Sequence, residues 1–333
     1  MQPFQQSSDV LAKVYDAVLL DLDGVVYVGH DAVPGVIDSL NAANKEFGLT
    51  LTCVTNNAAR SPKTVAEHLQ ELGMNVGPDD VVTSAQAGAA ELAKRLAPGS
   101  SVFVLGSKDL IAEVELVGLQ ASQDPDGDYR AFIQGYWPDM PWRMLGVAAK
   151  VVRTGVLWVA TNMDFTIPTP FGLSPGNGTM VNALAAATGR TPDVVAGKPE
   201  VPLMQQSIDR AAAKHPLVVG DRLDTDIEGA NKVGIDSLLV LSGVTTIAEL
   251  LAAPRDLRPT YLSWDARGID DAHEAVSDLT NFQGWGVVDA QLSGRGDSLD
   301  AVRLVAVAVW SGQMEISQGL SALKAIGLEV QTS

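Results

Sequence analysis

The chain has 333 residues, and its 40 Asp and Glu against 23 Lys and Arg give a net charge of −17 at pH 7. This charge opposes non-specific binding to nucleic acid or to an anionic membrane surface, and no apolar run reaches the roughly 20 residues of a membrane-spanning helix. The N-terminus lacks the charged and apolar regions of a signal peptide, and a single cysteine excludes a disulfide framework. The composition therefore predicts a soluble, cytoplasmic protein.

Short apolar runs alternate with amphipathic stretches over most of the chain, a pattern that predicts a doubly wound, parallel, Rossmann-like α/β sheet. Residues 172–180 form a Gly-rich stretch before a helix and are expected to be a loop that faces substrate. The strands are predicted at residues 17–22, 49–57, 101–106, 129–137, 156–164, 216–221 and 237–243. The helices are predicted at residues 34–48, 61–73, 87–97, 141–155, 179–189, 200–215, 225–234 and 246–254.

The pattern changes after about Leu262. One strand is predicted at residues 284–292, and two helices are predicted at residues 298–313 and 315–327. We therefore expect residues 263–333 to form a small α+β module of their own, whose role the sequence does not define.

Polar side chains follow four of the predicted apolar runs at the point where each run ends. Asp21 and Asp23 end the first strand, and Lys198 ends the short run that begins at Asp193. Because ligands of open parallel sheets bind beyond the carboxyl ends of the strands, we expect all of these side chains to meet at one sheet edge. The remaining strand-end residues are Thr55, Asn56, Asn57, Asp221 and Asp226.

These residue types together indicate phosphoryl chemistry. Converging carboxylates repel one another, and a hard cation such as Mg²⁺ removes that conflict while adding the positive charge that an acidic protein needs to hold phosphate. Lys198 adds a second cation, and the Thr55 hydroxyl and nearby backbone N–H groups can donate to phosphoryl oxygens. Asp21 is then a nucleophile that forms an aspartyl-phosphate. Asp23 is the acid that protonates the leaving alcohol and the base that activates water.

Four short motifs stand in a characteristic order: DLDGVV at 21–26, TNN at 55–57, GKP at 197–199 and GDRLDTD at 220–226. They resemble the four motifs of the haloacid dehalogenase (HAD) superfamily of phosphatases. The residues of the last two motifs, and the long insert between the second and third, resemble those of the C2-capped class IIA branch. The resemblance covers about residues 15–262.

The resemblance implies a role for each motif residue. Asp21 and Asp23 are catalytic, whereas Thr55, Asn56, Asn57 and Lys198 bind the phosphoryl group. Asp21, the carbonyl of Asp23, and Asp221 hold Mg²⁺, and Asp226 supports the metal site. Substrate choice is implied for the end of the strand at 156–164, with Asn162 and Asp164, and for the loop 165–178 that follows it.

The resemblance also implies a domain organisation. Residues 14–83 and 191–262 form the HAD hydrolase core, and the insert at 84–190 forms a C2 cap that closes over the site and selects the leaving group. Residues 263–333 are an accessory module that resembles the extra module of a bacterial subgroup of glycerol 3-phosphate phosphatases.

The substrate is expected to be a small phosphorylated metabolite. No basic residue occurs between Gly155 and Gly189, which disfavours a second anionic group and favours a small, polyol-like leaving group. Together with the resemblance of the C-terminal module, this makes sn-glycerol 3-phosphate, from the recycling of glycerophospholipid polar heads, the expected substrate. Phosphoglycolate, pyridoxal phosphate and nucleotide substrates stay open, as does a homodimer.

Three alternatives belong to other functional classes, and one of them is a catalytically silent binding module that acts through its C-terminal region. A phospho-accepting switch also uses strand-end Asp, Thr and Lys residues with Mg²⁺, but it has no use for the acid Asp23 or for a cap-sized insert. A non-hydrolytic phosphotransferase would carry the same motifs, so only turnover distinguishes it. Two further residues are interpreted as structural: Asp224 as a solvated loop acid, and Cys53 as a buried thiol of an apolar strand.

Overall fold

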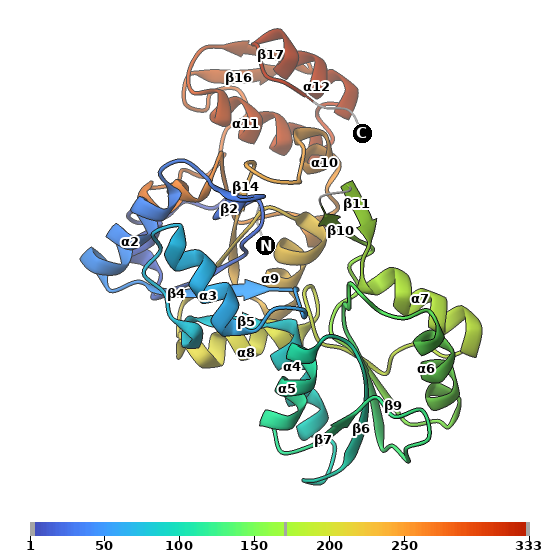
Figure 1. Ribbon diagram of the computed structural model, residues 1–333. Helices are drawn as coiled ribbons and strands as arrows, with labels where there is room; N and C mark the ends of the chain where they lie inside the picture. The colour runs from blue at the N-terminus through green and yellow to red at the C-terminus, as the bar shows by residue number, and fades with distance from the viewer. Residues whose placement is uncertain (1–3, 170–171, 331–333) are drawn as a thin grey trace. The chain divides into compact units, whose positions relative to one another are not determined.

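A computed structural model describes residues 4–169 and 172–330 (Figure 1). The chain divides into two compact units. The first comprises Met1–Thr52, Leu72–Asn75 and Ala211–Ser333, and the second comprises Cys53–Glu71 and Val76–Arg210. No helix in the described ranges is long and apolar enough to cross a membrane.

A six-stranded sheet carries the two acidic motifs. Its strands run in the order β15-β14-β13-β1-β4-β5, and the pairs β15·β14, β14·β13, β13·β1 and β4·β5 are parallel. The four residues of β1 are all buried, as expected of an interior parallel strand. This arrangement confirms the predicted doubly wound α/β fold. The strands are β1 (Ala17–Leu20), β4 (Thr50–Thr55), β5 (Val81–Thr83), β13 (Pro216–Gly220), β14 (Asp236–Val240) and β15 (Tyr261–Ser263).

Besides its strands of this sheet, the first unit contains several helices and, before its C-terminal segment, a small hairpin. The hairpin pairs β2 (Tyr27–Val28) with β3 (Asp31–Ala32) directly after the DLDGVV motif. The helices are α1 (Leu11–Val14), α2 (Val36–Phe47), η2 (Leu223–Ile227), α9 (Glu228–Val233), α10 (Ile247–Ala252), η3 (Arg255–Leu257) and η4 (Ala266–Asp270).

The C-terminal segment packs within the first unit (Figure 1). It contains β16 (Trp285–Val288), β17 (Gln291–Gly294), α11 (Ser298–Trp310) and α12 (Ile316–Ala325). Val302 and Val305 of α11 share a hydrophobic cluster with Leu250 of α10. The single strand predicted at 284–292 is wrong, because an antiparallel hairpin occupies these residues. Its turn residues, Asp289 and Ala290, both have positive φ, and the sequence carries no Asn-Gly signal that would reveal such a turn.

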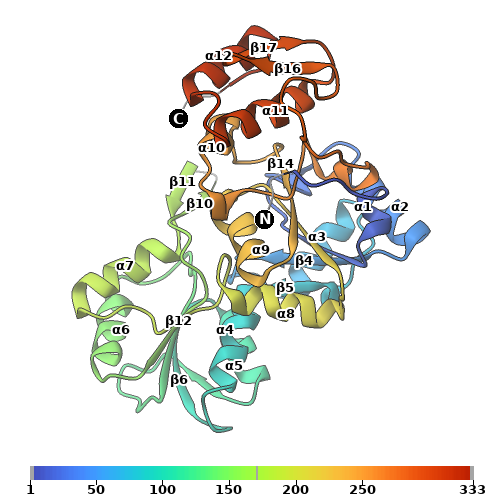
Figure 2. The ribbon, with the colours of Figure 1, turned by 180° about the vertical axis from the view of Figure 1, so that it is seen from behind.

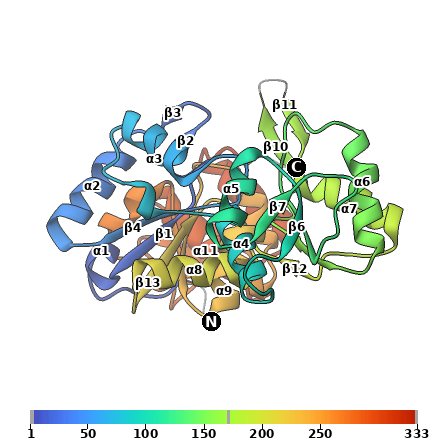
Figure 3. The same cartoon turned by 60° about the horizontal axis from the view of Figure 1, so that its bottom comes forward.

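A second parallel sheet forms the centre of the second unit, in the order β12-β9-β8-β6-β7. Its strands are β6 (Ser101–Leu105), β7 (Gln120–Ser122), β8 (Ala131–Gln134), β9 (Leu157–Ala160) and β12 (Val194–Val195). Figures 2 and 3 show α4 and α5 on one face of this sheet and α6 and α7 on the other. The helices of the unit are α3 (Pro62–Glu71), η1 (Pro78–Asp80), α4 (Ser84–Ala93), α5 (Lys108–Leu116), α6 (Arg143–Arg153), α7 (Asn177–Thr188) and α8 (Val201–Ala211).

Two sequence expectations need correction here. The run at 193–199 was expected to end in the same sheet as Asp21, but its strand β12 pairs with β9 of the second sheet. A two-residue apolar run does not specify its pairing partner, which is why the pattern was misleading. The loop expected at 172–180 is instead β11 (Gly172–Pro175), paired with β10 (Thr166–Thr169), followed by the start of α7. Of the expected specificity loop 165–178, residues 170 and 171 lie outside the described residues.

Candidate active site

Three carboxylates meet in the first unit. Asp21 follows β1 and Asp221 follows β13, and these strands are neighbours with Leu20 opposite Val219. The Asp21 N–H donates to the Val219 carbonyl oxygen over 2.9 Å, which extends the ladder to the acid itself. Asp226 lies in η2. One carboxylate oxygen from each of Asp21, Asp221 and Asp226 lies within 4.8 Å of the others.

The Asp221 side chain is held by backbone groups and has almost no spare room. The Val244 N–H donates to Asp221 Oδ2 over 2.6 Å, and the side chain is fully buried. A Cβ at Gly24 would lie 2.4 Å from Asp221 Oδ2, and one at Gly243 would lie 1.9 Å from it. Gly24 also has a φ of +83°, so its backbone favours glycine as well. These two glycines therefore keep the space that the carboxylate occupies.

Asp226 is fixed in a similar way. It is 1% exposed, and its Oδ2 accepts a hydrogen bond of 3.2 Å from the Arg222 N–H. A Cβ at Gly220 would lie 2.3 Å from the Asp226 side chain. Asp224, two residues before, points elsewhere: it is mostly exposed and pairs with Arg222 over 2.9 Å, as expected of a solvated loop acid.

The cluster fits a hard divalent cation. Three convergent carboxylates, two of them buried, offer only oxygen ligands, which suits Mg²⁺ or Ca²⁺ rather than softer metals. Without a cation, their mutual repulsion would cost free energy. The Asp23 carboxylate is not a member of the cluster, and its residue is exposed. This position is compatible with the sequence expectation, which assigned the Asp23 carbonyl to the metal and its side chain to proton transfer.

A second polar cluster lies in the second unit and centres on Asn56. Its Nδ2 donates to Asp164 Oδ1 over 3.2 Å and to the Lys198 carbonyl over 3.1 Å, and its Oδ1 accepts from the Lys198 N–H over 2.8 Å. Lys198 is 4% exposed, and its Nζ donates to the Val54 carbonyl over 3.2 Å. Asn162 Nδ2 donates to the Asn56 carbonyl over 2.7 Å. Four residues predicted from separate parts of the sequence are therefore in direct contact.

The other two residues of the TNN motif stabilise the local turn. The Asn57 N–H donates to Thr55 Oγ1 over 3.1 Å, and Asn57 Oδ1 accepts from the Ala59 N–H over 2.8 Å. Gly197 is needed beside them, because a Cβ there would lie 2.5 Å from Asn56 Oδ1. The strand end and the GKP motif are thus locked to each other by the Asn56 side chain.

Sequence reasoning missed two members of this cluster. The Ser84 hydroxyl donates to the Asn56 carbonyl over 2.5 Å, and Asn177 Nδ2 donates to the Asn162 carbonyl over 2.8 Å. Asn177 lies in the Gly-rich stretch that was singled out, so its position was a usable signal. Ser84 opens α4 and resembles an ordinary helix start in the sequence, so nothing pointed to it.

Two family models match the chain. One, described as haloacid dehalogenase-like hydrolase, matches residues 18–120, and a second of the same superfamily matches residues 195–267. The D-glycerol 3-phosphate phosphatase of Mycobacterium tuberculosis is 43% identical over 317 residues, which is 91% of this chain and 88% of that protein. The chain belongs to the HAD-like hydrolases. This membership confirms the resemblance inferred from the four motifs.

Other HAD relatives are phosphatases by name. The acid sugar phosphatase of Staphylococcus aureus is 34% identical over 269 residues, which is 80% of this chain and 99% of that protein. The crystal structure of the M. tuberculosis glycerol phosphate phosphatase with magnesium has a TM-score of 0.86 at 40% identity, covering 97% of this chain and all of that one. The p-nitrophenyl phosphatase of Archaeoglobus fulgidus has a TM-score of 0.71 at 30% identity, covering 77% and 98%.

Proposed function

We propose that this HAD hydrolase is a Mg²⁺-dependent phosphomonoesterase that hydrolyses sn-glycerol 3-phosphate to glycerol and phosphate. The observation that supports it most directly is the convergence of Asp21, Asp221 and Asp226. A carboxylate nucleophile placed beside two cation-binding carboxylates suits attack on phosphorus. When bound, Mg²⁺ supplies positive charge that offsets the carboxylates and the phosphoryl oxygens.

The first step transfers the phosphoryl group to the protein. A carboxylate oxygen of Asp21 attacks phosphorus, and the bond from phosphorus to the alcohol oxygen breaks. Asp23 gives its proton to that oxygen, so glycerol leaves as the neutral alcohol. The exposed position of Asp23, outside the metal-binding cluster, supports this role.

The second step restores the enzyme. Asp23, now a carboxylate, removes a proton from water while the water oxygen attacks the phosphorus of the aspartyl-phosphate. The bond between phosphorus and Asp21 breaks, which frees inorganic phosphate and regenerates both side chains.

Thr55, Asn56, Asn57 and Lys198 are proposed to bind the phosphoryl group. The burial of Lys198 supports this role, because a buried ammonium interacts more strongly with an anion than an exposed one. Asn56 fixes the backbone of Lys198 at both its N–H and its carbonyl, which holds this cation in place. Asn162 and Asp164 contact Asn56 and are proposed to contribute to substrate choice.

The choice of substrate rests on relatives and on charge. The M. tuberculosis relative is named for glycerol 3-phosphate and the S. aureus relative for acid sugars, and both leaving groups carry hydroxyls. The segment from Gly155 to Gly189 contains no basic residue, as suits a neutral leaving group. The boundaries 14–83 with 191–262 for the core, 84–190 for the cap and 263–333 for the accessory module are proposed with it. The homodimer and the cytoplasmic location stay predictions.

A phosphate-release assay tests the proposal. Purified protein with Mg²⁺ should give its highest kcat/KM on sn-glycerol 3-phosphate in a panel with phosphoglycolate, pyridoxal phosphate and a nucleotide monophosphate. Asp21→Asn should lose at least about 1,000-fold in kcat, whereas Asp224→Asn, in the same acidic region but outside the cluster, should retain activity. A higher kcat/KM on phosphoglycolate would refute the substrate, and an active Asp21→Asn would refute the mechanism.

A further inference from the structure

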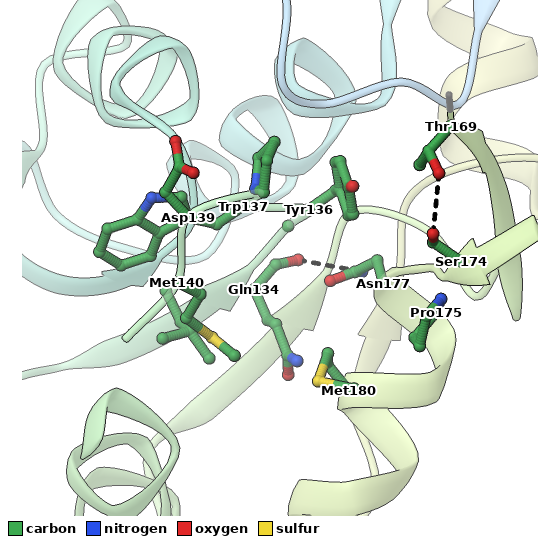
Figure 4. A pocket seen from close by; sticks show the side chains of 13 residues that line it. Gln134, Tyr136, Trp137, Asp139, Met140, Thr169, Ser174, Pro175, Asn177 and Met180 are labelled. Carbon is green, nitrogen blue, oxygen red and sulfur yellow. Dashed lines mark hydrogen bonds between the residues drawn. The ribbon is translucent and has the colours of Figure 1, made fainter. Parts of the chain in front are cut away.

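A cavity of about 500 Å³ lies within the second unit, beyond the carboxyl end of β8 (Figure 4). The end of β8, the segment after it, the β10–β11 hairpin and the start of α7 form its walls. A volume of this size lies within the range of small-molecule sites. The end of a parallel strand is also where α/β sheets place their ligands.

The side chain of Gln134 forms part of the cavity wall and is 1% exposed. Neither its Nε2 nor its Oε1 has a hydrogen-bond partner among the described residues, and the same holds for Oδ1 of Asn177. In Figure 4 the Gln134 amide lies between the side chains of Met140 and Met180. Buried amides in folded proteins are nearly always hydrogen-bonded to protein groups or to ordered water, so these unmet groups mark a place beside the cavity where a polar molecule would bind.

The unmet atoms define the ligand chemistry. Gln134 offers an NH₂ donor and a carbonyl acceptor, and Asn177 offers a further acceptor. A hydroxyl both donates and accepts, so a molecule with several hydroxyls satisfies all of these groups at once. Met140 and Met180 have flexible, unbranched side chains, so a small rotation gives a ligand access to the amide.

The remaining walls exclude charged anions. The cavity is lined by the rings of Tyr136 and Trp137, and its only charged lining residue within the described chain is Asp139, an acid. No Lys, Arg or His is among the described residues that line it. A phosphate or carboxylate group would therefore meet no cation here, whereas a neutral molecule can pack its C–H groups on the rings.

Hydrogen bonds connect the cavity to the Asn56 cluster inside the same unit. Asn177 Nδ2 donates to the Asn162 carbonyl, and Asn162 Nδ2 donates to the Asn56 carbonyl. Asn177 Nδ2 also donates to the backbone carbonyl of Gln134 over 3.5 Å; the dashed line in Figure 4 marks this bond. These hydrogen bonds therefore fix the position of the cavity wall relative to the residues of the same unit that are proposed to bind phosphate.

We propose that this cavity binds a neutral polyol and that Gln134 is the residue that selects it. The site takes the hydroxyl-bearing part of the substrate or the released alcohol. Only this identification of the polyol with the leaving group rests on the proposed function. Binding of a free polyol to the cavity does not.

Direct binding tests the site. Saturation-transfer NMR with glycerol and with sorbitol, each at millimolar concentration, is measured on the full chain, on Gln134→Met and on Gln206→Met. Gln206 is a matched control, because its Oε1 is also buried without a partner among the described residues but it does not line the cavity. The wild type and Gln206→Met should show ligand signals, and Gln134→Met should lose them. Equal signals from all three proteins, or none from the wild type, would overturn the proposal.

Two further measurements separate this inference from a structural role and from the proposed function. Gln134→Met should keep the melting temperature of the wild type, because it removes unmet polar atoms at similar volume; a clear drop would assign Gln134 to the fold instead. Its KM for sn-glycerol 3-phosphate should rise about tenfold relative to its KM for p-nitrophenyl phosphate, whose leaving group has no hydroxyl besides the oxygen of the broken bond. Polyol binding without hydrolysis of sn-glycerol 3-phosphate would contradict the proposed function but not the proposal that the cavity binds a polyol.

Discussion

The acid cluster of the first unit and the Asn56 cluster of the second unit are built on different principles. Asp21, Asp221 and Asp226 bring like charges together, so their arrangement calls for a cation. Asn56, by contrast, joins Lys198, Asp164 and Asn162 through hydrogen bonds between groups of the protein itself. One cluster therefore depends on what binds to it, and the other is preorganised before anything binds.

The largest expected effect comes from Gly243→Ala, which breaks the acid cluster alone. The new Cβ would meet Asp221 Oδ2 at 1.9 Å, so the carboxylate must move away from its partners. We expect kcat/KM to fall at least about 1,000-fold and the Mg²⁺ requirement to rise, since a displaced ligand weakens the metal's contribution. Metal titrations of phosphate release measure this. Gly146→Ala in α6, where a Cβ meets nothing within 4 Å, is the control and should stay active.

A second prediction concerns stability of the first unit away from its acid cluster. Burial, together with the nearby Arg303, lowers the pKa of His273 to about 4. Its Nδ1 contacts Arg303 Nη2 over 3.2 Å and its Nε2 contacts the Gly268 carbonyl over 2.9 Å, which suits the neutral ring. The unfolded chain binds the proton at about pH 6.5, so stability is full above that pH and falls towards pH 4 by up to roughly 3 kcal/mol.

Urea unfolding across this pH range checks the prediction. His273→Gln should flatten the fall in unfolding free energy between about pH 6.5 and pH 4, whereas His215→Gln, at an exposed histidine, should leave the fall unchanged. An identical pH profile for wild type and His273→Gln would show that other groups cause the acid sensitivity.

Asn56→Asp tests the preorganised cluster without touching the acid cluster. The substitution removes the N–H donor to Asp164 and to the Lys198 carbonyl. It also places a negative charge beside both of these acceptors. We expect kcat/KM to fall about 30-fold with little change in the Mg²⁺ requirement. The double variant Asn56→Asp with Asp164→Asn restores a donor–acceptor pair and should recover part of the loss. If it is no better than the single variant, the Asn56–Asp164 contact does not matter for activity.

The smallest expected effect is at the C-terminal segment. Asp297 is the N-cap of α11, with its Oδ1 accepting from the Leu299 N–H over 2.7 Å. Asp297→Ala should lower the free energy of unfolding by about 1 kcal/mol and leave phosphate release unchanged. If activity falls by more than the loss of stability accounts for, this segment takes part in catalysis.

Much of the acid cluster was predictable because its determinants are local. Asp21 and Asp221 directly follow apolar β-strand patterns, and parallel strands align their carboxyl ends, so the sequence alone placed both acids at one edge. The seven strands predicted before residue 244 are all present, each shorter than predicted. Asp21 and Asp221 lie just after the ends of their strands, whereas Thr55 is the last residue of β4 and pairs with Thr83.

The Asn56 cluster was predictable only in part. The sequence indicated Asn56, Asn162, Asp164 and Lys198 as separate candidates, but it placed Lys198 after a strand of the wrong sheet. The two-residue strand β12 pairs with β9, and this pairing joins residues far apart in the chain. Ser84 and Gln134 carry no motif at all, and their importance arises from what surrounds them.

The sequence by itself indicated the family, through the order of its four motifs, and it placed Asp21 and Asp221 at the ends of neighbouring strands, because short apolar runs followed by acids are local patterns. Only the tertiary structure decided which side chains hold Asn56 and Lys198 in place, that residues 284–294 form a hairpin, and that the Gln134 amide lies buried beside a cavity. Hydrogen bonds and burial depend on neighbours distant in sequence, and no local pattern encodes them. For this reason the sequence predicted the residues proposed for the reaction, but not Gln134, which is proposed to recognise the leaving group.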